Sequence, residues 1–339
     1  MKTEQRIYVA LAVLAALGFG VYAVQRRQKA EDLRHAPAAS GSLPDFKISA
    51  DDADKATKIE IKNADKGEVV LEKKDGKWRV QKPVDYPATE SSVKSLLDNL
   101  KELKVKELID PGKASYAEYG VDDAKAVHVV VTKEGTKILD AWFGKSGGRG
   151  QMARIAGKDG VYAVGGYSAY LYAREVKGWR DGNITKFEDD KVTKVELSNE
   201  AGDFVFTKEG EAWSAKKGKD KLERFDEAKA KDLVRAFKGL TAEDFGDGKS
   251  DADTGLDKPT ATLTLSFKEG SPEKLTIGKT SSGESRYLKK DGNPQVFVIS
   301  SWAAGWATAK ADKFQKPEEK KDDKKKDEKK DEKKDDKKK

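Results

Sequence analysis

The sequence predicts an α+β protein in which two tandem homologous, strand-dominated domains follow an N-terminal transmembrane helix. Three observations predict this class: an apolar stretch near the N-terminus, an internal repeat, and strand-like alternation around one amphipathic helix in each copy. Each domain is expected to be a mostly antiparallel sheet with one main packed helix. The predicted organisation is an anchor at 1–27, a linker at 28–44, repeat domains at 45–187 and 188–315, and a disordered tail at 316–339.

The N-terminal stretch 7–24 carries no charged residue and is bounded by Arg6 and Arg26. Its length is at the short end of the ~20 apolar residues that cross a bilayer as a helix. A cleaved signal peptide is the alternative, because Val21 and Ala23 suit a small-residue cleavage site. The apolar core of a signal peptide usually spans only about 7–15 residues, so we favour an uncleaved single-pass anchor in contact with membrane lipid.

The orientation of this anchor depends on two opposing arguments. More Lys and Arg residues follow the stretch than precede it, which favours a cytoplasmic C-terminal side. A first span with a short N-terminal tail commonly inserts as a signal anchor, however, and large domains translocate despite local charge. We expect an inner-membrane protein whose domains lie outside the cytoplasm.

The internal repeat has a spacing of roughly 135 residues. Blocks of similar sequence return in the same order along the two copies. These pairs of blocks are 57–61 and 193–197, 74–78 and 208–213, 119–122 and 254–257, 143–146 and 277–280, 160–164 and 295–299, and finally Trp179 and Phe314. Such an ordered series at nearly one offset indicates a duplication, and therefore one fold for both copies.

Each copy begins with alternating strands and continues with one helix, at 90–103 in the first copy and 226–238 in the second. Thr89 and Asp226 suit the N-cap positions of these helices. A second group of strands follows in each copy. These strands are 127–132, 137–143 and 161–164, matched by 261–267, 274–277 and 296–299.

Charges of both signs are finely mixed, since 67 Lys and Arg residues stand against 60 Asp and Glu residues. Nucleic-acid binding would gather basic side chains on one face with aromatics between them, so no nucleic-acid partner is expected. Cysteine is absent, and the only histidines are His35 and His128. Disulfides, cysteine catalysis and zinc sites are thereby excluded, and no cofactor or metal is expected. The tail alternates Lys with Asp and Glu and has no apolar residue to bury, which predicts disorder.

The chain resembles a bacterial family described as domain of unknown function 4340, and the similarity covers nearly everything from the anchor to about residue 300. The matching segments are 7–24, 56–61, 71–80, 119–122, 143–145 and 179–187. The resemblance implies a single-pass envelope protein, and relatives are often encoded beside gliding-type ABC transporter components. It brings no catalytic residues, and the Lys/Asp/Glu tail departs from the usual pattern.

The segments 144–146 and 278–280, Gly-Lys-Ser and Gly-Lys-Thr, each follow a predicted strand and invite comparison with a phosphate-binding loop. Such a loop needs a glycine five positions earlier and a helix directly afterwards. Leu139 and Glu273 occupy the earlier positions, and turn residues come next. Both segments therefore predict tight hairpin turns.

Basic side chains near these turns are candidate contacts for a partner. Lys145 and Lys279 lie within the turns, and Arg154 and Arg286 lie at similar points after them. If the turns share a face, each copy presents a basic pair for an acidic partner or a carboxylate ligand. The alternative is that all four are solvated cations.

Aromatic residues form a second candidate surface near the end of each copy. Trp302 and Trp306 would stack on one face of a helix, because they are four residues apart. The matching stretch of the first copy holds Tyr162, Tyr167, Tyr170 and Tyr172. Glycan binding through these rings is one interpretation, and packing beneath the terminal element is the other.

Signatures of a nucleophile, a base or a metal site are missing from the sequence, so a non-enzymatic protein is expected. Together with the resemblance, this predicts a membrane-anchored envelope protein that serves as an accessory or interaction component of an ABC-type transport or motility complex. The alternative is a cell-wall or glycan binding module that uses the Tyr/Trp cluster.

Overall fold

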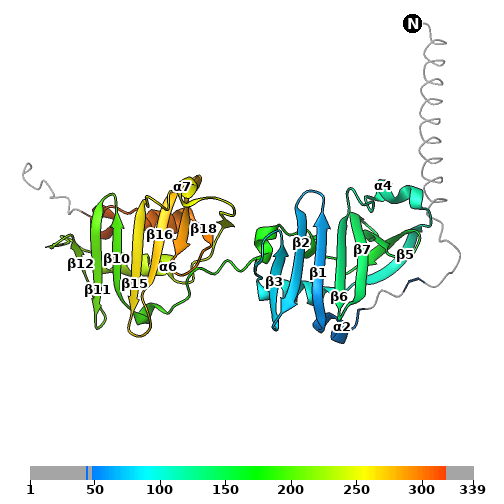
Figure 1. Ribbon diagram of the computed structural model, residues 1–339, viewed down its shortest axis with the longest axis horizontal. Helices are drawn as coiled ribbons and strands as arrows, with labels where there is room; N and C mark the ends of the chain where they lie inside the picture. Colours follow the sequence, from blue (N-terminus) through cyan, green and yellow to red (C-terminus); the bar gives the residue numbers. More distant parts are fainter. Residues whose placement is uncertain (1–42, 45–47, 318–339) are drawn as a thin grey trace, which may run out of the picture. The chain divides into compact units, whose positions relative to one another are not determined.

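The computed structural model describes residues 43–44 and 48–317. The predicted anchor, nearly all of the predicted linker and most of the charged tail lie outside these ranges. Within them, no helix is long and apolar enough to cross a membrane. The chain divides into two compact units between Asp181 and Gly182 (Figure 1).

Each unit contains one nine-stranded antiparallel sheet, and both sheets have the same strand order. In order across the first sheet, the strands are β4 (Tyr86–Pro87), β3 (Lys77–Lys82), β2 (Gly67–Lys74), β1 (Ala56–Asn63), β6 (Val127–Lys133), β7 (Thr136–Gly147), β8 (Gly150–Ile155), β9 (Val161–Gly165) and β5 (Lys104–Asp110). In the second sheet they are β13 (Asp220–Lys221), β12 (Ala212–Lys217), β11 (Gly202–Glu209), β10 (Val192–Asn199), β15 (Ala261–Phe267), β16 (Glu273–Ser282), β17 (Ser285–Lys290), β18 (Val296–Ile299) and β14 (Asp244–Phe245). The prediction of a two-domain, strand-rich fold is confirmed.

The strand order follows from two meanders joined by one crossing segment. In the first unit, β1 to β3 form consecutive hairpins, and β6 then pairs with the free side of β1. Ile59 lies opposite both Leu71 and Val131, and in the second unit Val195 lies opposite both Phe206 and Leu265. The duplication therefore extends to the register of individual side chains.

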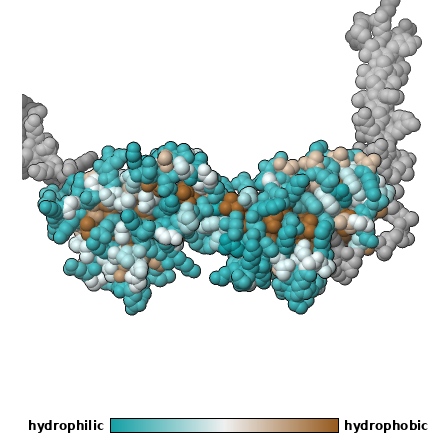
Figure 2. All heavy atoms as spheres, viewed as in Figure 1, coloured by the Kyte–Doolittle hydropathy of each residue, from teal (hydrophilic) through white to brown (hydrophobic). Residues whose placement is uncertain are grey.

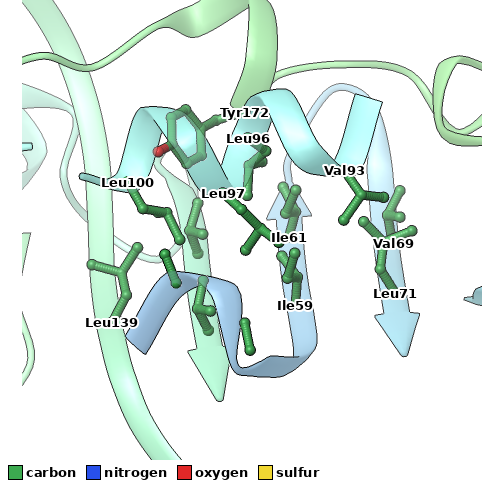
Figure 3. Packing of buried hydrophobic residues seen from close by; sticks show 14 of the residues in the cluster. Ile59, Ile61, Val69, Leu71, Val93, Leu96, Leu97, Leu100, Leu139 and Tyr172 are labelled. Atoms are coloured by element: carbon green, nitrogen blue, oxygen red, sulfur yellow. The ribbon is translucent and has the colours of Figure 1, made fainter. Parts of the chain in front are cut away.

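One main helix packs in each unit, as predicted: α3 (Glu90–Leu100) in the first unit and α6 (Glu227–Phe237) in the second. The buried side chains of α3 follow helical spacing, and they point at the apolar faces of β1, β2 and β7 (Figure 3). These helix residues are Val93, Leu96, Leu97 and Leu100. Burial of each such side chain contributes about 1.5–3 kcal/mol to stability, so this layer forms the core of the unit.

The last segment of each copy is joined by a backbone hydrogen bond to the residue that precedes its main helix. The backbone N–H of Thr89 donates to the carbonyl of Trp179 at 2.8 Å, and that of Asp226 donates to the carbonyl of Phe314 at 2.9 Å. Trp179 and Phe314 are both fully buried. The side chain of Asp226 caps its helix by accepting a hydrogen bond from the backbone N–H of Ala228. Thr89 forms no such side-chain cap, and its hydroxyl donates instead to the carbonyl of Arg180 at 2.7 Å. The repeated Trp179 and Phe314 positions therefore close the core.

The remaining helices are short, and α8 (Ser301–Ala307) also packs against β15 and β17. In the first unit they are α2 (Ala50–Asp54), η1 (Lys113–Ser115), α4 (Tyr116–Tyr119), α5 (Ala169–Tyr172) and η2 (Val176–Trp179). In the second unit they are η3 (Asp189–Lys191), α7 (Asp251–Thr254), α8 (Ser301–Ala307) and η4 (Ala311–Phe314).

Candidate functional site

The Gly-Lys segments 144–146 and 278–280 lie within strands β7 and β16, so the prediction of tight hairpin turns there is wrong. Each is instead an irregularity of strand pairing at which two stretches of backbone meet, and the name Gly-Lys turn is kept for it. A Cβ atom added to Gly144 would collide with the carbonyl oxygen of Tyr119 and lie 2.6 Å from the carbonyl carbon of Gly120. Gly120 ends α4 in the left-handed region, with φ of 67°. In the second unit, an added Cβ on Gly278 collides with the carbonyl oxygen of Thr254 in the same way. Glycine is needed at these positions for close approach, which explains why both blocks recur.

The lysines beside these glycines are exposed to solvent. Lys145 lies near the end of β7, and Lys279 lies at the matching place in β16. Neither lysine forms an ion pair within the part of the chain that the structure describes.

Arg154 and Arg286 do not occupy matching positions, so the expectation of equivalent basic pairs is wrong. Phe143 pairs with Ala153 in the first sheet, and its counterpart Ile277 pairs with Leu288 in the second. The counterpart of Arg154 is therefore Lys289, and the counterpart of Arg286 is Gln151.

Arg154 belongs to a stack of side chains on the face of the first sheet opposite α3. Neighbouring strands place His128, Trp142 and Arg154 side by side. The Trp142 ring lies parallel to His128 at 4.0 Å, and the Arg154 guanidinium lies 3.7 Å from the centre of the Trp142 ring. Arg154 also donates to the carboxylate of Asp123 at 2.5 Å, so its charge is already neutralised. We call His128, Trp142 and Arg154 the aromatic stack.

One end of the aromatic stack is held by a half-buried carboxylate, that of Asp140. The Nε2 atom of His128 lies 2.8 Å from Asp140, and Lys137 donates to the same carboxylate at 2.7 Å. Burial alone would raise the pKa of Asp140, but the hydrogen bonds from His128 and Lys137 outweigh burial and lower it. The sequence analysis missed this group, although alternate polar and aromatic residues on adjacent predicted strands were a usable signal.

Arg286 has a different environment from Arg154. Its Nη1 atom donates to the hydroxyl of Thr260 and to the carbonyl of Gly278, both at 3.2 Å. It lines a cleft of about 320 Å³, which we call the Arg286 cleft. The lining residues are Asn199, Glu200, Ala201, Thr260, Arg286, Thr308 and Lys310.

Trp302 and Trp306 lie on one helix, α8, but do not share an exposed face, so the packing interpretation holds for Trp306 alone. Trp302 is 56% exposed, whereas Trp306 is 6% exposed. The Trp306 ring packs 6.0 Å from Phe314 and is covered by the ammonium of Lys313 at 4.4 Å. Trp306 therefore closes the core and leaves Trp302 as the accessible ring.

Most of the tyrosine cluster is also core. The rings of Tyr167 and Tyr172 stack at 4.8 Å and pack on Phe143. Burial raises the pKa of both hydroxyls. Tyr162 is buried as well, and Tyr170 is 78% exposed. Each unit thus presents one exposed aromatic residue on the helix that follows its last long strand, Tyr170 on α5 and Trp302 on α8.

Elsewhere, the visible face of each unit is mostly hydrophilic and is interrupted by small, separate hydrophobic areas (Figure 2). The adjacent acidic residues Asp51 and Asp52 both form ion pairs with Lys133. Among residues 43–44 and 48–317, no group of three or more His, Cys, Asp or Glu side chains could hold a metal ion.

A comparison of the chain with models of protein families identifies the family to which it belongs. A model described as "Domain of unknown function (DUF4340)" matches residues 78–259 and again residues 250–326. The chain belongs to this family. The resemblance inferred from the sequence is thereby confirmed, and the DUF4340 matches include both Gly-Lys turns and both exposed aromatics. No curated protein and no solved structure matched the chain.

Proposed function

We propose that this DUF4340 protein is a non-enzymatic envelope protein, anchored in the inner membrane by its N-terminal segment, that binds other proteins. Its partners are proposed to be subunits of an ABC-type transport or motility complex. The proposal places both units outside the cytoplasm, tethered by the 28–44 segment.

The observation that carries this proposal is that each unit exposes one aromatic side chain on the helix after its last long strand. Tyr170 and Trp302 occupy corresponding helices and are the most exposed large hydrophobic side chains of the described residues. Single exposed apolar residues are common on protein surfaces. The two rings do not occupy equivalent positions, because at the repeat offset of 135 residues Trp302 corresponds to Tyr167 and Tyr170 to Gly305. Each unit still exposes one ring in the same segment, and Tyr and Trp are the residues most enriched among energetic hot spots of interfaces. Two exposed aromatic rings on one chain, one in each unit, would also permit bivalent binding.

The proposal is tested by purifying the full-length protein from gently solubilised membranes and identifying the proteins that accompany it. We expect ABC permease or auxiliary subunits with the wild-type chain. Replacing both rings, Tyr170→Ser with Trp302→Ser, should reduce their recovery at least tenfold, since loss of one hot-spot side chain costs about 2 kcal/mol or more. The matched control is Tyr170→Phe with Trp302→Phe, which keeps an aromatic ring at each place. Equal recovery with the Ser and Phe variants would contradict the assignment of these rings.

A cell-wall or glycan binding module is the second candidate, and the exposed Trp302 ring favours it. An aromatic face open to solvent can stack on a sugar ring as readily as on a protein side chain. The discriminating measurement is sedimentation of the protein with purified cell wall. Co-sedimentation that the Ser variants abolish, without recovery of any membrane subunit, would replace the first proposal with this one.

A further inference from the structure

In the Arg286 cleft, the fold holds the guanidinium of Arg286 in place without neutralising its charge. Both N–H groups of Nη1 are directed to the protein, one to Thr260 and one to Gly278. The Nε and Nη2 atoms form no bond within the described residues, and neither is a buried atom without a partner, so both remain open to solvent. These two atoms form the edge of a guanidinium that binds a carboxylate through two parallel hydrogen bonds.

A second cation lies in the same cleft. Lys310 lines the cleft after α8, is exposed, and forms no ion pair within the described residues. The one acidic residue of the lining, Glu200, is exposed in the turn between β10 and β11, and it too has no ion-pair partner there. The cleft therefore offers two unpaired cations and one carboxylate, an excess of positive charge.

The first unit supplies an internal comparison for this cleft. Gln151 stands at the position of Arg286, and its amide donates to the carbonyl of Gly144 at 2.6 Å. Ala126 stands at the position of Thr260, and both residues of the first unit are buried. A neutral amide is thus sufficient to hold the Gly-Lys turn in this fold. The arginine of the second unit adds a half-buried charge that the turn does not need, and burying an unpaired charge is unfavourable.

From this geometry we propose that the second unit binds a carboxylate side chain of a partner polypeptide in the Arg286 cleft. The Nε and Nη2 atoms of Arg286 bind the two carboxylate oxygens, and Lys310 supplies the second positive charge. A volume of about 320 Å³ holds roughly ten water molecules at ~30 Å³ each, which suits one acidic side chain and its neighbouring backbone. This inference deepens the proposed function, because it assumes a protein partner.

The test is a titration of the full-length protein in detergent with two short peptides, acetyl-Gly-Glu-Gly-amide and acetyl-Gly-Gln-Gly-amide. The peptides have nearly the same shape and differ by one charge. Binding is followed through the ¹⁵N–¹H signal of Arg286 Nε, which is assigned by its loss in Arg286→Lys. We expect a saturable shift with the Glu peptide and none with the Gln peptide at the same concentration.

Two further variants give effects of opposite sign. Lys310→Gln should weaken binding of the Glu peptide about two- to fivefold, and Glu200→Gln should tighten it by a similar factor, as expected for exposed charge pairs. Both residues are exposed, so neither change should alter folding. A loss of binding caused by general unfolding would not reproduce this pattern.

Equal shifts with both peptides, or no saturable shift with either, would overturn the proposal. Acetate that binds as tightly as the Glu peptide would overturn it as well, because the cleft would then recognise a free small carboxylate. The outcome is separate from the membrane purification. Failure to recover membrane subunits would refute the proposed function and leave the titration unaffected, and a negative titration would leave the recovered subunits standing.

Discussion

Replacing Gly144 by Ala tests the explanation of the Gly-Lys turn most directly. The added methyl group would lie 2.6 Å from the carbonyl carbon and the carbonyl oxygen of Gly120. Carbon atoms in contact normally lie about 3.5–4.0 Å apart, so the backbone would have to separate by about 1 Å. These obstructing atoms belong to backbone, which cannot rotate away as a flexible side chain can. Overpacking of this kind costs about 1–3 kcal/mol, and we expect a value near the upper end.

The chain offers a matched control three positions further along the same strand. An alanine Cβ at Gly147 would meet nothing within 4 Å. Gly147→Ala should therefore leave the free energy of unfolding unchanged or raise it by about 0.4–1 kcal/mol, because alanine restricts the unfolded chain. The two variants change the sequence by the same single methyl group.

Urea unfolding of the full-length protein, followed by circular dichroism, measures the difference. With a urea dependence of about 2 kcal/mol/M, a loss near 3 kcal/mol lowers the midpoint of the affected transition by about 1.5 M. Gly278→Ala should have a similar effect in the second unit, where the added Cβ would collide with the carbonyl oxygen of Thr254. Equal midpoints for Gly144→Ala and Gly147→Ala would refute the reasoning, and the recurrence of the glycine would need another cause.

Three further predictions concern the first unit. Trp142→Ala should lower the free energy of unfolding by about 1.5–3 kcal/mol through loss of the Arg154 and His128 contacts, and Trp142→Phe by less, as measured by urea unfolding. The pKa of Asp140 is lowered by folding, so its contribution is present above the unfolded pKa of about 3.9 and disappears as pH falls through the folded value. Wild type should therefore exceed Asp140→Asn in stability at pH 7 and lose this advantage near pH 2 in parallel urea titrations. Leu96→Ala should cost about 2–5 kcal/mol in the same assay, since Leu96 is fully buried, with the exposed Ser95→Ala as the control.

The strands and the main helix of each copy were predictable because their patterns are local. The helix 90–103 was expected from apolar spacing, and the structure places α3 at Glu90–Leu100. Leu103 lies beyond the helix yet is buried, so periodicity alone extended the prediction by one turn. The internal repeat added long-range information, because two copies of one pattern restrict both to the same fold.

The environments of single aromatic residues were not predictable in this way. Trp302 and Trp306 are the same residue type on the same helix, and their spacing places them on one side of it. Their environments differ because η4 places Phe314 against Trp306 and leaves Trp302 exposed to solvent. This contact joins residues from different elements, and no pattern within α8 reports it. Tyr170 and Tyr172 are a different case, because residues two apart on a helix point to different sides, and their exposures are 78% and 0%.

The two arginines show how strand register limits a comparison of copies. Arg154 and Arg286 are 132 residues apart in number, whereas the paired residues Ala153 and Leu288 are 135 apart. At the offset of 135 residues, Arg154 corresponds to Lys289 and Arg286 to Gln151, so the two arginines lie three positions apart on equivalent strands. Side chains an odd number of positions apart on a strand point to opposite faces of the sheet. Arg154 therefore joins the aromatic stack and is neutralised by Asp123, while Arg286 is held beside Gly278 with two of its nitrogen atoms open. Two residues of one type, after the same turn in two copies of one fold, thus have different chemistry, and only the arginine of the second unit remains available to a ligand.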